Sequence, residues 1–189
     1  ALAAKGATLF DTATLAPITT DLVVKAHTVG DVSASQKAPG NTAVWVSTTT
    51  VKSADGTIRS QSVKRAAFDS YSAEAVNCCG NFMETTQGVR EQVNRSGLIF
   101  KFPFNTEKKT YQFWDDTLGK AVTTKYIGTA KIQGHTAWLF ENDVPATVVG
   151  SQDVPGSLVG QASNDNVSAD SYYQNKNTYY VEPITGAIV

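Results

Sequence analysis

The stretch that decides the fold is Val44-Trp45-Val46-Ser47-Thr48-Thr49-Thr50-Val51, which is dense in β-branched and aromatic side chains. The residues that follow, Ser53-Ala54-Asp55-Gly56, have the composition of a tight turn. A second run extends from Thr57 to Phe68, so the region predicts a β-hairpin. Because hydroxyl side chains occur on both faces of the first strand, we expect a strand with a semi-polar face.

The clearest alternation in the chain is Leu98-Ile99-Phe100-Lys101-Phe102-Pro103-Phe104. It places Leu98 and the three phenylalanines on one face and predicts a strand with one buried side. Proline has no N–H to donate, so this strand should end or lie at a sheet edge at Pro103. We expect residues 105–109 to form a loop and residues 111–115 to return antiparallel to the first strand.

Other segments continue the β pattern. Strands are predicted at residues 22–30, 121–126, 130–140 and 177–181, followed by a turn at 182–186 and a final strand at 187–189. The stretch from Val144 to Ser168 is rich in Gly, Ser, Asn, Asp and Pro, which predicts a loop with one short helix near 169–176. The whole pattern predicts one β-rich domain over residues 1–189.

Composition narrows the functional classes. The 189 residues carry 16 basic and 17 acidic side chains, so the chain has no long-range positive field to attract nucleic acid. No apolar run approaches the ~18 residues of a membrane-spanning helix. Only 17% of the residues are charged, while uncharged polar residues are abundant, as is common in envelope and secreted proteins.

The two cysteines, Cys78 and Cys79, are adjacent in the sequence. This spacing does not match a metal knuckle. It leaves three alternatives: a vicinal disulfide, two free thiols, or bridges between chains.

Catalytic candidates are few. The only imidazoles, His27 and His135, lie in no recognisable motif, and the common nucleophile, phosphate and dinucleotide motifs are absent from the sequence. Asp115-Asp116 and Glu141-Asn142-Asp143 offer carboxylates, but at strand ends such residues normally form solvated caps and turns. We therefore expect no enzyme activity, no cofactor and no metal site.

Aromatic residues gather in one meander, and two interpretations fit them. They are either ordinary core, or the lining of a cavity that accepts a lipid or other apolar ligand. The candidate lipid-binding residues are Phe100, Phe102, Phe104, Phe113, Trp114, Trp138 and Phe140. Lys101, Lys108 and Lys109 flank them, either as a solvated loop or as a site for an acidic headgroup, and Lys64-Arg65 is a further basic pair.

Three stretches carry a family resemblance. They are Ala67-Phe68-Asp69 through Glu74-Ala75-Val76-Asn77-Cys78-Cys79-Gly80, then Gly97-Leu98 with Lys101-Phe102-Pro103-Phe104-Asn105-Thr106-Glu107-Lys108-Lys109-Thr110-Tyr111-Gln112-Phe113-Trp114-Asp115, and Tyr180-Val181-Glu182-Pro183 with Thr185-Gly186. Together they resemble the actinobacterial porin-PorA-like family, which includes a mycobacterial protein that controls lipoglycans. The second stretch is long and therefore specific.

The resemblance implies an extracytoplasmic domain on the periplasmic side of the plasma membrane, with membrane-anchoring segments outside residues 1–189. It also implies a role in assembling or maintaining lipomannan and lipoarabinomannan. The fold it implies is an elongated, antiparallel, barrel-like β-meander with one or two short helices and an internal cavity. The family brings no established catalytic residues, so the resemblance assigns none to this chain. A pore is disfavoured on the residues themselves, because serine, threonine and charge interrupt the apolar faces of the strands.

Three functional hypotheses follow. The first is a binding module that holds an amphiphilic lipid, such as a phosphatidylinositol mannoside or other phospholipid, and presents it to membrane enzymes. The second is a scaffold that docks a membrane glycosyltransferase or transporter through a strand edge. The third is a carboxylate-dependent glycosidase or transferase, which requires two acidic side chains about 5 to 10 Å apart in one cleft.

Overall fold

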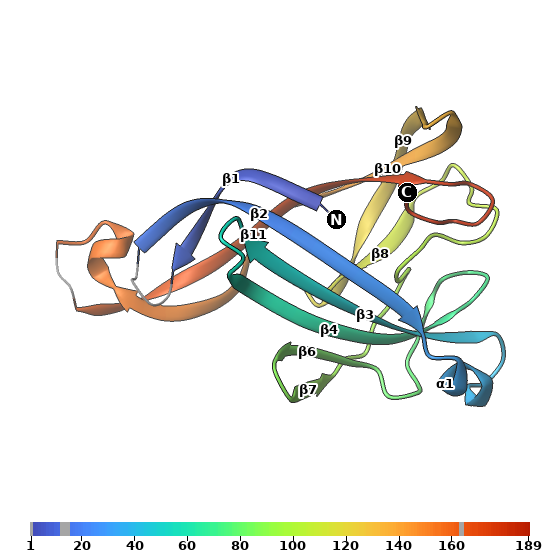
Figure 1. Cartoon of the computed structure of the whole chain (residues 1–189), viewed down its shortest axis with the longest axis horizontal. Coiled ribbons are helices and arrows are strands. Elements are labelled where there is room, and N and C mark those ends of the chain that lie inside the picture. Colours follow the sequence, from blue (N-terminus) through green and yellow to red (C-terminus); the bar gives the residue numbers. More distant parts are fainter. Residues whose placement is uncertain (1, 12–15, 163–164) are drawn as a thin grey trace. The chain divides into compact units, whose positions relative to one another are not determined.

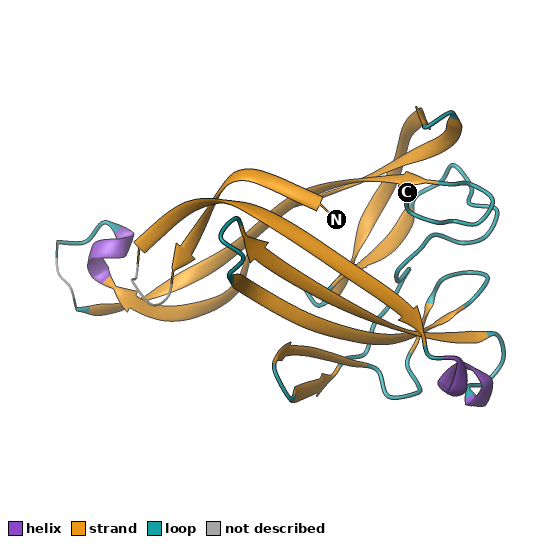
Figure 2. Ribbon diagram, viewed as in Figure 1, coloured by secondary structure: helices purple, strands orange, loops and turns teal. Residues whose placement is uncertain are grey.

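The structure is a computed structural model that describes residues 2–11, 16–162 and 165–189. Antiparallel β-strands dominate these ranges, and the helices they contain are α1 (Val32–Lys37) and the short 3-10 helix η1 (Gly156–Val159) (Figure 2). The predicted mainly β, antiparallel class is therefore confirmed. No helix in the described part of the chain has the length and apolar character needed to cross a membrane.

The chain divides into two compact units. Unit 1 comprises Ala1–Ser70 and Val76–Asn94, and unit 2 comprises Tyr71–Ala75 and Arg95–Val189. A two-residue strand, β5 (Ala75–Val76), falls at the boundary between them. The single domain over residues 1–189 stays a prediction.

Unit 1 is built on one open antiparallel sheet, with strand order β1-β2-β3-β4-β6-β7. Its strands are β1 (Leu2–Asp11), β2 (Ala16–Gly30), β3 (Thr42–Ser53), β4 (Ile58–Asp69), β6 (Phe82–Thr86) and β7 (Val89–Gln92). The predicted strands at 22–30 and 44–51 are confirmed within β2 and β3.

The hairpin of β3 and β4 is confirmed, and its turn shows why. The Asp55 carboxylate accepts hydrogen bonds from the Ser53 hydroxyl at 2.5 Å and from the Thr57 N–H at 3.0 Å. These bonds lower the pKa of Asp55 to about 2. Beyond the turn, Val44 and Phe68 are buried, and the Trp45 and Phe68 rings meet edge to face at 4.9 Å.

Unit 2 is built on a second open antiparallel sheet, with strand order β11-β10-β9-β8. Its strands are β8 (Tyr111–Asp115), β9 (Lys120–Ile132), β10 (His135–Pro155) and β11 (Asn166–Val181). The predicted strands at 111–115, 121–126 and 177–181 are confirmed within β8, β9 and β11. The strand predicted at 130–140 is not one strand, because residues 130–132 end β9, residues 133–134 form a turn, and β10 begins at His135. Over the described residues neither sheet closes on itself, so the two sheets are open and form no closed barrel.

The loop and helix predicted for residues 144–176 are wrong. β10 runs on to Pro155, and β11 starts at Asn166, so the two strands pair as a long ribbon that extends past β9 (Figure 1). A two-stranded ribbon has little apolar surface to bury, so its strands tolerate the Ser, Asn, Asp and Gly that normally indicate a loop. Two register shifts, at 144–147 and 148–150, put the extra residues on β10 and leave β11 regular.

A ladder of polar side chains crosses this sheet on one face. Buried Asn142 donates to the Tyr179 hydroxyl at 3.2 Å and accepts from Asn177 at 3.1 Å. The ladder continues through Asn175 to the Tyr173 hydroxyl, which donates to Asp115 at 3.0 Å. The polar side chains of this network therefore form hydrogen bonds with one another, which offsets the cost of burying them in the sheet.

The strand predicted at Leu98–Phe104 is wrong. Leu98 makes only isolated bridges within the described residues, an antiparallel one to Glu74 and a parallel one to Phe113. Phe100 has a φ of 66°, which no strand adopts. The residues from 99 to 110 are irregular. The predicted faces also fail, because Ile99 and Lys101 are buried with Leu98 and Phe102, while Phe104 is exposed.

The turn at 183–186 supplies the hydrogen bonds that this segment would have made in a sheet. Phe102 N–H donates to the Gly186 carbonyl at 2.8 Å, and the next two bonds, from Asn105 and Thr106, go to the carbonyls of residues 184 and 183 at 2.9 and 2.8 Å. We call this contact the C-terminal clamp. The predicted turn at 182–186 is confirmed, whereas the final strand at 187–189 is reduced to one bridge, between Ile188 and Val181.

The C-terminal clamp predicts a stringent glycine requirement at Gly186. It has a φ of 72°, and a Cβ there would lie 2.0 Å from the Phe102 carbonyl oxygen. Gly134 is a matched control, because its φ is 86° but a Cβ would meet nothing within 4 Å. We expect Gly134→Ala to cost about 1–2 kcal/mol in the free energy of unfolding, the ordinary penalty of a left-handed residue, and Gly186→Ala to cost at least ~2 kcal/mol more. Equal losses in urea unfolding would contradict the clamp.

Candidate functional site

Four of the seven aromatic residues proposed for lipid contact lie in the core of unit 2. Phe102 is fully buried, and its ring lies 4.6 Å from that of Phe140 and 5.5 Å from that of Phe113. Trp114 is also buried, and its indole N–H donates to Asp116 at 2.8 Å. The rings of Phe113 and Phe140 pack on that of Phe102, so the interior they fill is dense.

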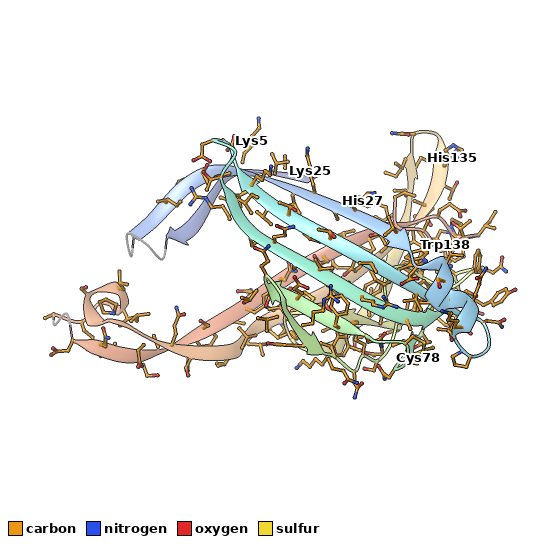
Figure 3. The ribbon with its side chains drawn as sticks, turned by 60° about the horizontal axis from the view of Figure 1, so that its bottom comes forward. Lys5, Lys25, His27, Cys78, His135 and Trp138 are labelled. Carbon is orange, nitrogen blue, oxygen red and sulfur yellow. A yellow bond between two sulfur atoms is a disulfide. The ribbon has the colours of Figure 1, made fainter. Side chains whose placement is uncertain are left out.

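The remaining three aromatic residues lie nearer the surface. Phe100 and Trp138 are half-buried, and Trp138 lies on β10 a few residues after the exposed His135 (Figure 3). Phe104 is 43% exposed, and its ring lies 6.0 Å from that of exposed Tyr71. Phe104 and Tyr71 therefore present an aromatic surface outside the core.

All three lysines proposed for headgroup contact lie over aromatic rings. The Lys101 ammonium is 3.6 Å from the centre of the Phe104 ring, and Lys109 is 5.5 Å from that of Tyr111. Lys108 lies 5.6 Å from Tyr126 and 5.3 Å from Trp138. Each distance is within the range of a cation–π interaction, so the rings fix where the three positive charges lie.

Lys101 differs from the other two lysines in burial. Only 8% of it is exposed, and this desolvation lowers the pKa of its ammonium. Lys109 is exposed, and its ion pair with Glu107 at 2.8 Å raises the pKa of Lys109. Lys109 is thus held in a charged state at the surface.

A groove of about 630 Å³ runs beside this cluster within unit 2. We call it the Phe104 groove. Its walls come from three short segments and one residue of β9: Ser72, Glu74, Ser96, Gly97, Pro103, Phe104, Asn105, Glu107, Lys109, Thr110, Tyr111, Gln112 and Ala121. The size is that of a small-molecule site, and the groove unites Phe104 and Lys109 from the sequence prediction.

The lining of the groove is mixed in chemistry. Hydroxyl, amide and carboxylate groups alternate with the Phe104 and Tyr111 rings. Tyr111 is fixed in place, because its hydroxyl accepts the Glu107 N–H at 2.9 Å. Such a surface suits a ligand with many hydroxyl groups and an anionic group, since it offers both hydrogen-bond acceptors and a cation.

Gly97 shapes the floor of the groove. Its φ is 70°, and a Cβ there would lie 2.4 Å from the Gln112 carbonyl oxygen. The neighbouring Leu98 N–H donates to that same carbonyl at 2.7 Å. Only glycine lets the chain approach β8 this closely.

Two smaller pockets offer less to bind. One, of about 320 Å³ in unit 2, is lined mainly by apolar atoms around Ile132, Ala137 and Val189, with His135 and Glu182 at its wall. The other, of about 370 Å³ in unit 1, is formed by polar side chains of β4 and by Glu84 with its neighbours. Neither contains any of the lysines or phenylalanines that the sequence singled out.

Cys78 and Cys79 are joined in a vicinal disulfide in unit 1. The side chain of buried Asn81 holds the loop that carries them: it accepts the Ala67 N–H of β4 at 2.8 Å and donates to the Val76 carbonyl at 3.0 Å. Figure 3 shows Cys78 in that loop. It also shows Lys5 on β1 and Lys25 and His27 on β2. Among the three alternatives left by the sequence, the structure has the vicinal bridge.

The carboxylates considered for catalysis have structural partners. Asp115 accepts two turn N–H groups, of Thr117 and Leu118, besides the Tyr173 hydroxyl. Glu141 pairs with Lys176 at 3.1 Å. Asp116 lies 3.4 Å from Arg95, whose side chain is fully buried. In the part of the chain described, no three His, Cys, Asp or Glu residues gather in a way that could hold a metal ion.

The second basic pair, Lys64-Arg65, lies on β4 of unit 1, apart in sequence from the lysines of the groove. Arg65 makes an ion pair with Asp31 at 3.0 Å. Asp31 in turn caps α1 by accepting the Ala34 N–H at 2.9 Å. Arg65 therefore anchors the helix to the sheet.

The open antiparallel sheets and the mixed polar and aromatic groove define a mainly β protein with a groove of small-molecule size in unit 2. A family model described as Porin PorA matches residues 1–189. The chain belongs to this family, which makes it a porin-like protein of the cell envelope. No curated protein matches the chain. The resemblance to a PorA-like family is confirmed, whereas the link to lipoglycans stays a prediction.

Sequence reasoning missed two features of the site. The acidic residues Glu74 and Glu107 were not singled out, although Glu107 two residues before Lys109 was a readable signal for an ion pair. The contact of each lysine with a ring was also missed. Tyr126 and Trp138 come from β9 and β10, and no local pattern links them to Lys108.

The pKa values of Glu74, in the Phe104 groove, and Glu84, in unit 1, are shifted in opposite directions, and this difference can be tested. Desolvation raises the pKa of Glu74 in the groove, whereas bonds from Gly88 N–H and Arg90 lower the pKa of Glu84 in unit 1. We expect the Glu74 carboxyl to titrate at higher pH than that of Glu84 when both are followed by carboxyl NMR. Since the folded state favours protonated Glu74, its contribution to stability is present at low pH and is lost as pH rises above 4.5. The reverse order of titration would show that the groove is more hydrated than described.

Proposed function

We propose that this chain is a non-enzymatic envelope protein that binds the headgroup of an amphiphilic lipid in the Phe104 groove, in support of lipoglycan assembly or transport. The observation that carries the proposal is the meeting, in one groove, of an exposed aromatic ring, a fixed lysine and many hydroxyl and amide groups. The ligand class it fits is an anionic phospholipid with a polyhydroxylated headgroup, such as a phosphatidylinositol mannoside.

The charges near the groove suit a phosphodiester. Lys109 lines the groove, and the Lys101 ammonium lies over the face of Phe104. A bound phosphate would replace Glu107 as the partner of Lys109 and would gain a charge-assisted hydrogen bond. The carboxylates of Glu74 and Glu107 remain available to accept hydrogen bonds from sugar or inositol hydroxyl groups.

The acyl chains need a different place from the one the sequence suggested. The rings of Phe102, Phe113 and Phe140 fill the core of unit 2 and leave no room for a chain between them. The exposed surface of Phe104 and Tyr71 is the nearest apolar contact for the first methylene groups. We therefore propose that the groove holds the headgroup and leaves most of each acyl chain outside unit 2.

Native mass spectrometry with lipid extraction tests the proposal on residues 1–189 purified from an actinobacterial host. We expect a stoichiometric phospholipid or mannosylated lipid in the wild-type protein. Lys109→Ala should weaken binding by roughly ten- to a hundredfold, the value of one charge-assisted bond, and Phe104→Ala should weaken it as well. Lys125→Ala, which removes an exposed lysine of β9 outside the groove, is the matched control and should leave binding unchanged.

Three results would contradict the proposal. A lipid-free mass for the wild-type protein would favour the scaffold, and co-purification of a membrane glycosyltransferase or transporter would identify its partner. Lipid binding that is equally strong in Lys109→Ala and Lys125→Ala would place the ligand elsewhere. Steady single-channel conductance in planar bilayers would instead favour the pore that the family description names.

A further inference from the structure

The outer edge of β11 presents a long row of backbone groups. β10 pairs with one edge of β11. Among the described residues, the other edge has a partner only near its end, where Val189 N–H donates to the Tyr180 carbonyl at 2.9 Å. Within the described ranges no strand pairs with the outer edge from Asn166 to Thr178. An edge of this length is a template for pairing with another strand.

The Tyr180 bond fixes which residues face outward. In an antiparallel ladder the N–H and C=O of one residue point to the same side, and successive residues alternate. Because Tyr180 points away from β10, the outward residues of this regular strand are the even-numbered ones from Ser168 to Thr178. Their side chains are the exposed ones, while those of residues 167–177 with odd numbers are half-buried.

The sequence of β11 is complementary to itself in one register. If two copies pair antiparallel about a two-fold axis at Tyr173, Asp170 lies directly opposite Lys176 of the second copy, and the same pair recurs across the axis. Tyr172 then faces Gln174 of the second copy. All of these residues point their N–H and C=O groups outward, so each opposed pair can exchange two hydrogen bonds.

In other registers, Asp170 no longer lies opposite Lys176 of the second copy. Moving the axis to residue 170 or 176 places two like charges directly opposite, and intermediate axes leave Asp170 and Lys176 facing uncharged residues. Opposite charges across a strand pair stabilise it, while like charges destabilise it. The Lys176 side chain is 60% exposed and pairs with Glu141 at 3.1 Å, so its ammonium already lies on the solvent-facing side of the sheet.

We propose that β11 pairs antiparallel with β11 of a second copy of this chain about a two-fold axis at Tyr173, so that the sheet of unit 2 continues from one copy into the other. The inference is independent of the lipid site, because none of the residues that line the Phe104 groove belongs to β11.

Charge variants test the register. We expect sedimentation equilibrium of residues 1–189 to show a dimer at micromolar concentration. Asp170→Lys should raise the dimer dissociation constant about tenfold or more, because two lysines then face each other at both ends of the contact. Adding Lys176→Asp to that variant restores the pairing and should return the constant to within about threefold of wild type. Lys131→Glu, at an exposed position of β9 whose partner on β10 is Thr136, is the control for a change of charge alone and should have no effect.

Cross-linking tests the axis without changing charge. Side chains of Tyr172 in the two copies are diagonal neighbours about 7–8 Å apart, so Tyr172→Cys should give a covalent dimer with a short bis-maleimide. Ser168→Cys is the matched control on the same face of β11. Its two copies would be separated by about 33 Å at ~3.3 Å per residue, so it should not cross-link with that reagent.

Three results would overturn the inference. A single-copy mass at all concentrations would show that the edge does not pair with itself, including the case where it binds a different chain. A dimer that ignores both Asp170→Lys and the double variant would use another surface. Equal cross-linking at residues 168 and 172 would exclude the proposed axis.

Discussion

The backbone of residues 102–106 has no sheet to pair with, and the turn at 183–186 supplies its partners. Three N–H groups of this segment donate to the carbonyls of residues 183, 184 and 186, and a fourth, that of Phe104, donates to the Tyr71 carbonyl. This constraint holds the Phe102 ring at the centre of unit 2, where it contacts Tyr111, Phe113, Phe140 and Tyr179. The rest of unit 2 depends on it, because strands β8, β10 and β11 all pack a ring against that one side chain.

The site is the outer side of the same segment. Phe102 points into the core, whereas Phe104 two residues later lies at the surface beside Tyr71, with the Lys101 ammonium over its ring. The φ of 66° at Phe100 makes the chain leave an extended path before it reaches this point. A regular strand would have placed Phe102 and Phe104 on the same face, so Phe104 would not line the groove at the surface.

The parts of the fold that could be predicted are those fixed by neighbours in sequence. The β3–β4 hairpin follows from β-branched residues and from the hydrogen bonds of Asp55 within its own turn. The segment from Leu98 to Phe104 alternates like a strand, yet its partners lie about eighty residues later, so no local pattern could reveal them. The β10–β11 ribbon could not be predicted for a different reason. Its strands bury little apolar surface, so their sequences need no alternation of apolar and polar residues.

Part of the candidate site could also be predicted, because some of its residues are neighbours in the sequence. Lys101, Phe104 and Lys109 belong to one short stretch, so their proximity follows from the sequence. Glu74, Ser96 and Gly97 enter the groove only because the chain returns to β8 through the bond between Leu98 and Gln112. Distinguishing packed rings from a cavity lining needed the ring distances, because a buried phenylalanine has the same pattern in both cases.

The unequal strands of the ribbon bear on how this chain can change over evolutionary time. β10 already takes up its extra residues in two bulges, so the gain or loss of one residue near positions 145–149 can be absorbed where the ladder is already interrupted. β11 contains no bulge that could absorb a change in its length. Losing one residue from it would turn Tyr173, Asn175 and Asn177 to the opposite face and separate them from Asn142 and Asp115. Length variation among relatives should therefore concentrate in one strand of the ribbon and spare the other.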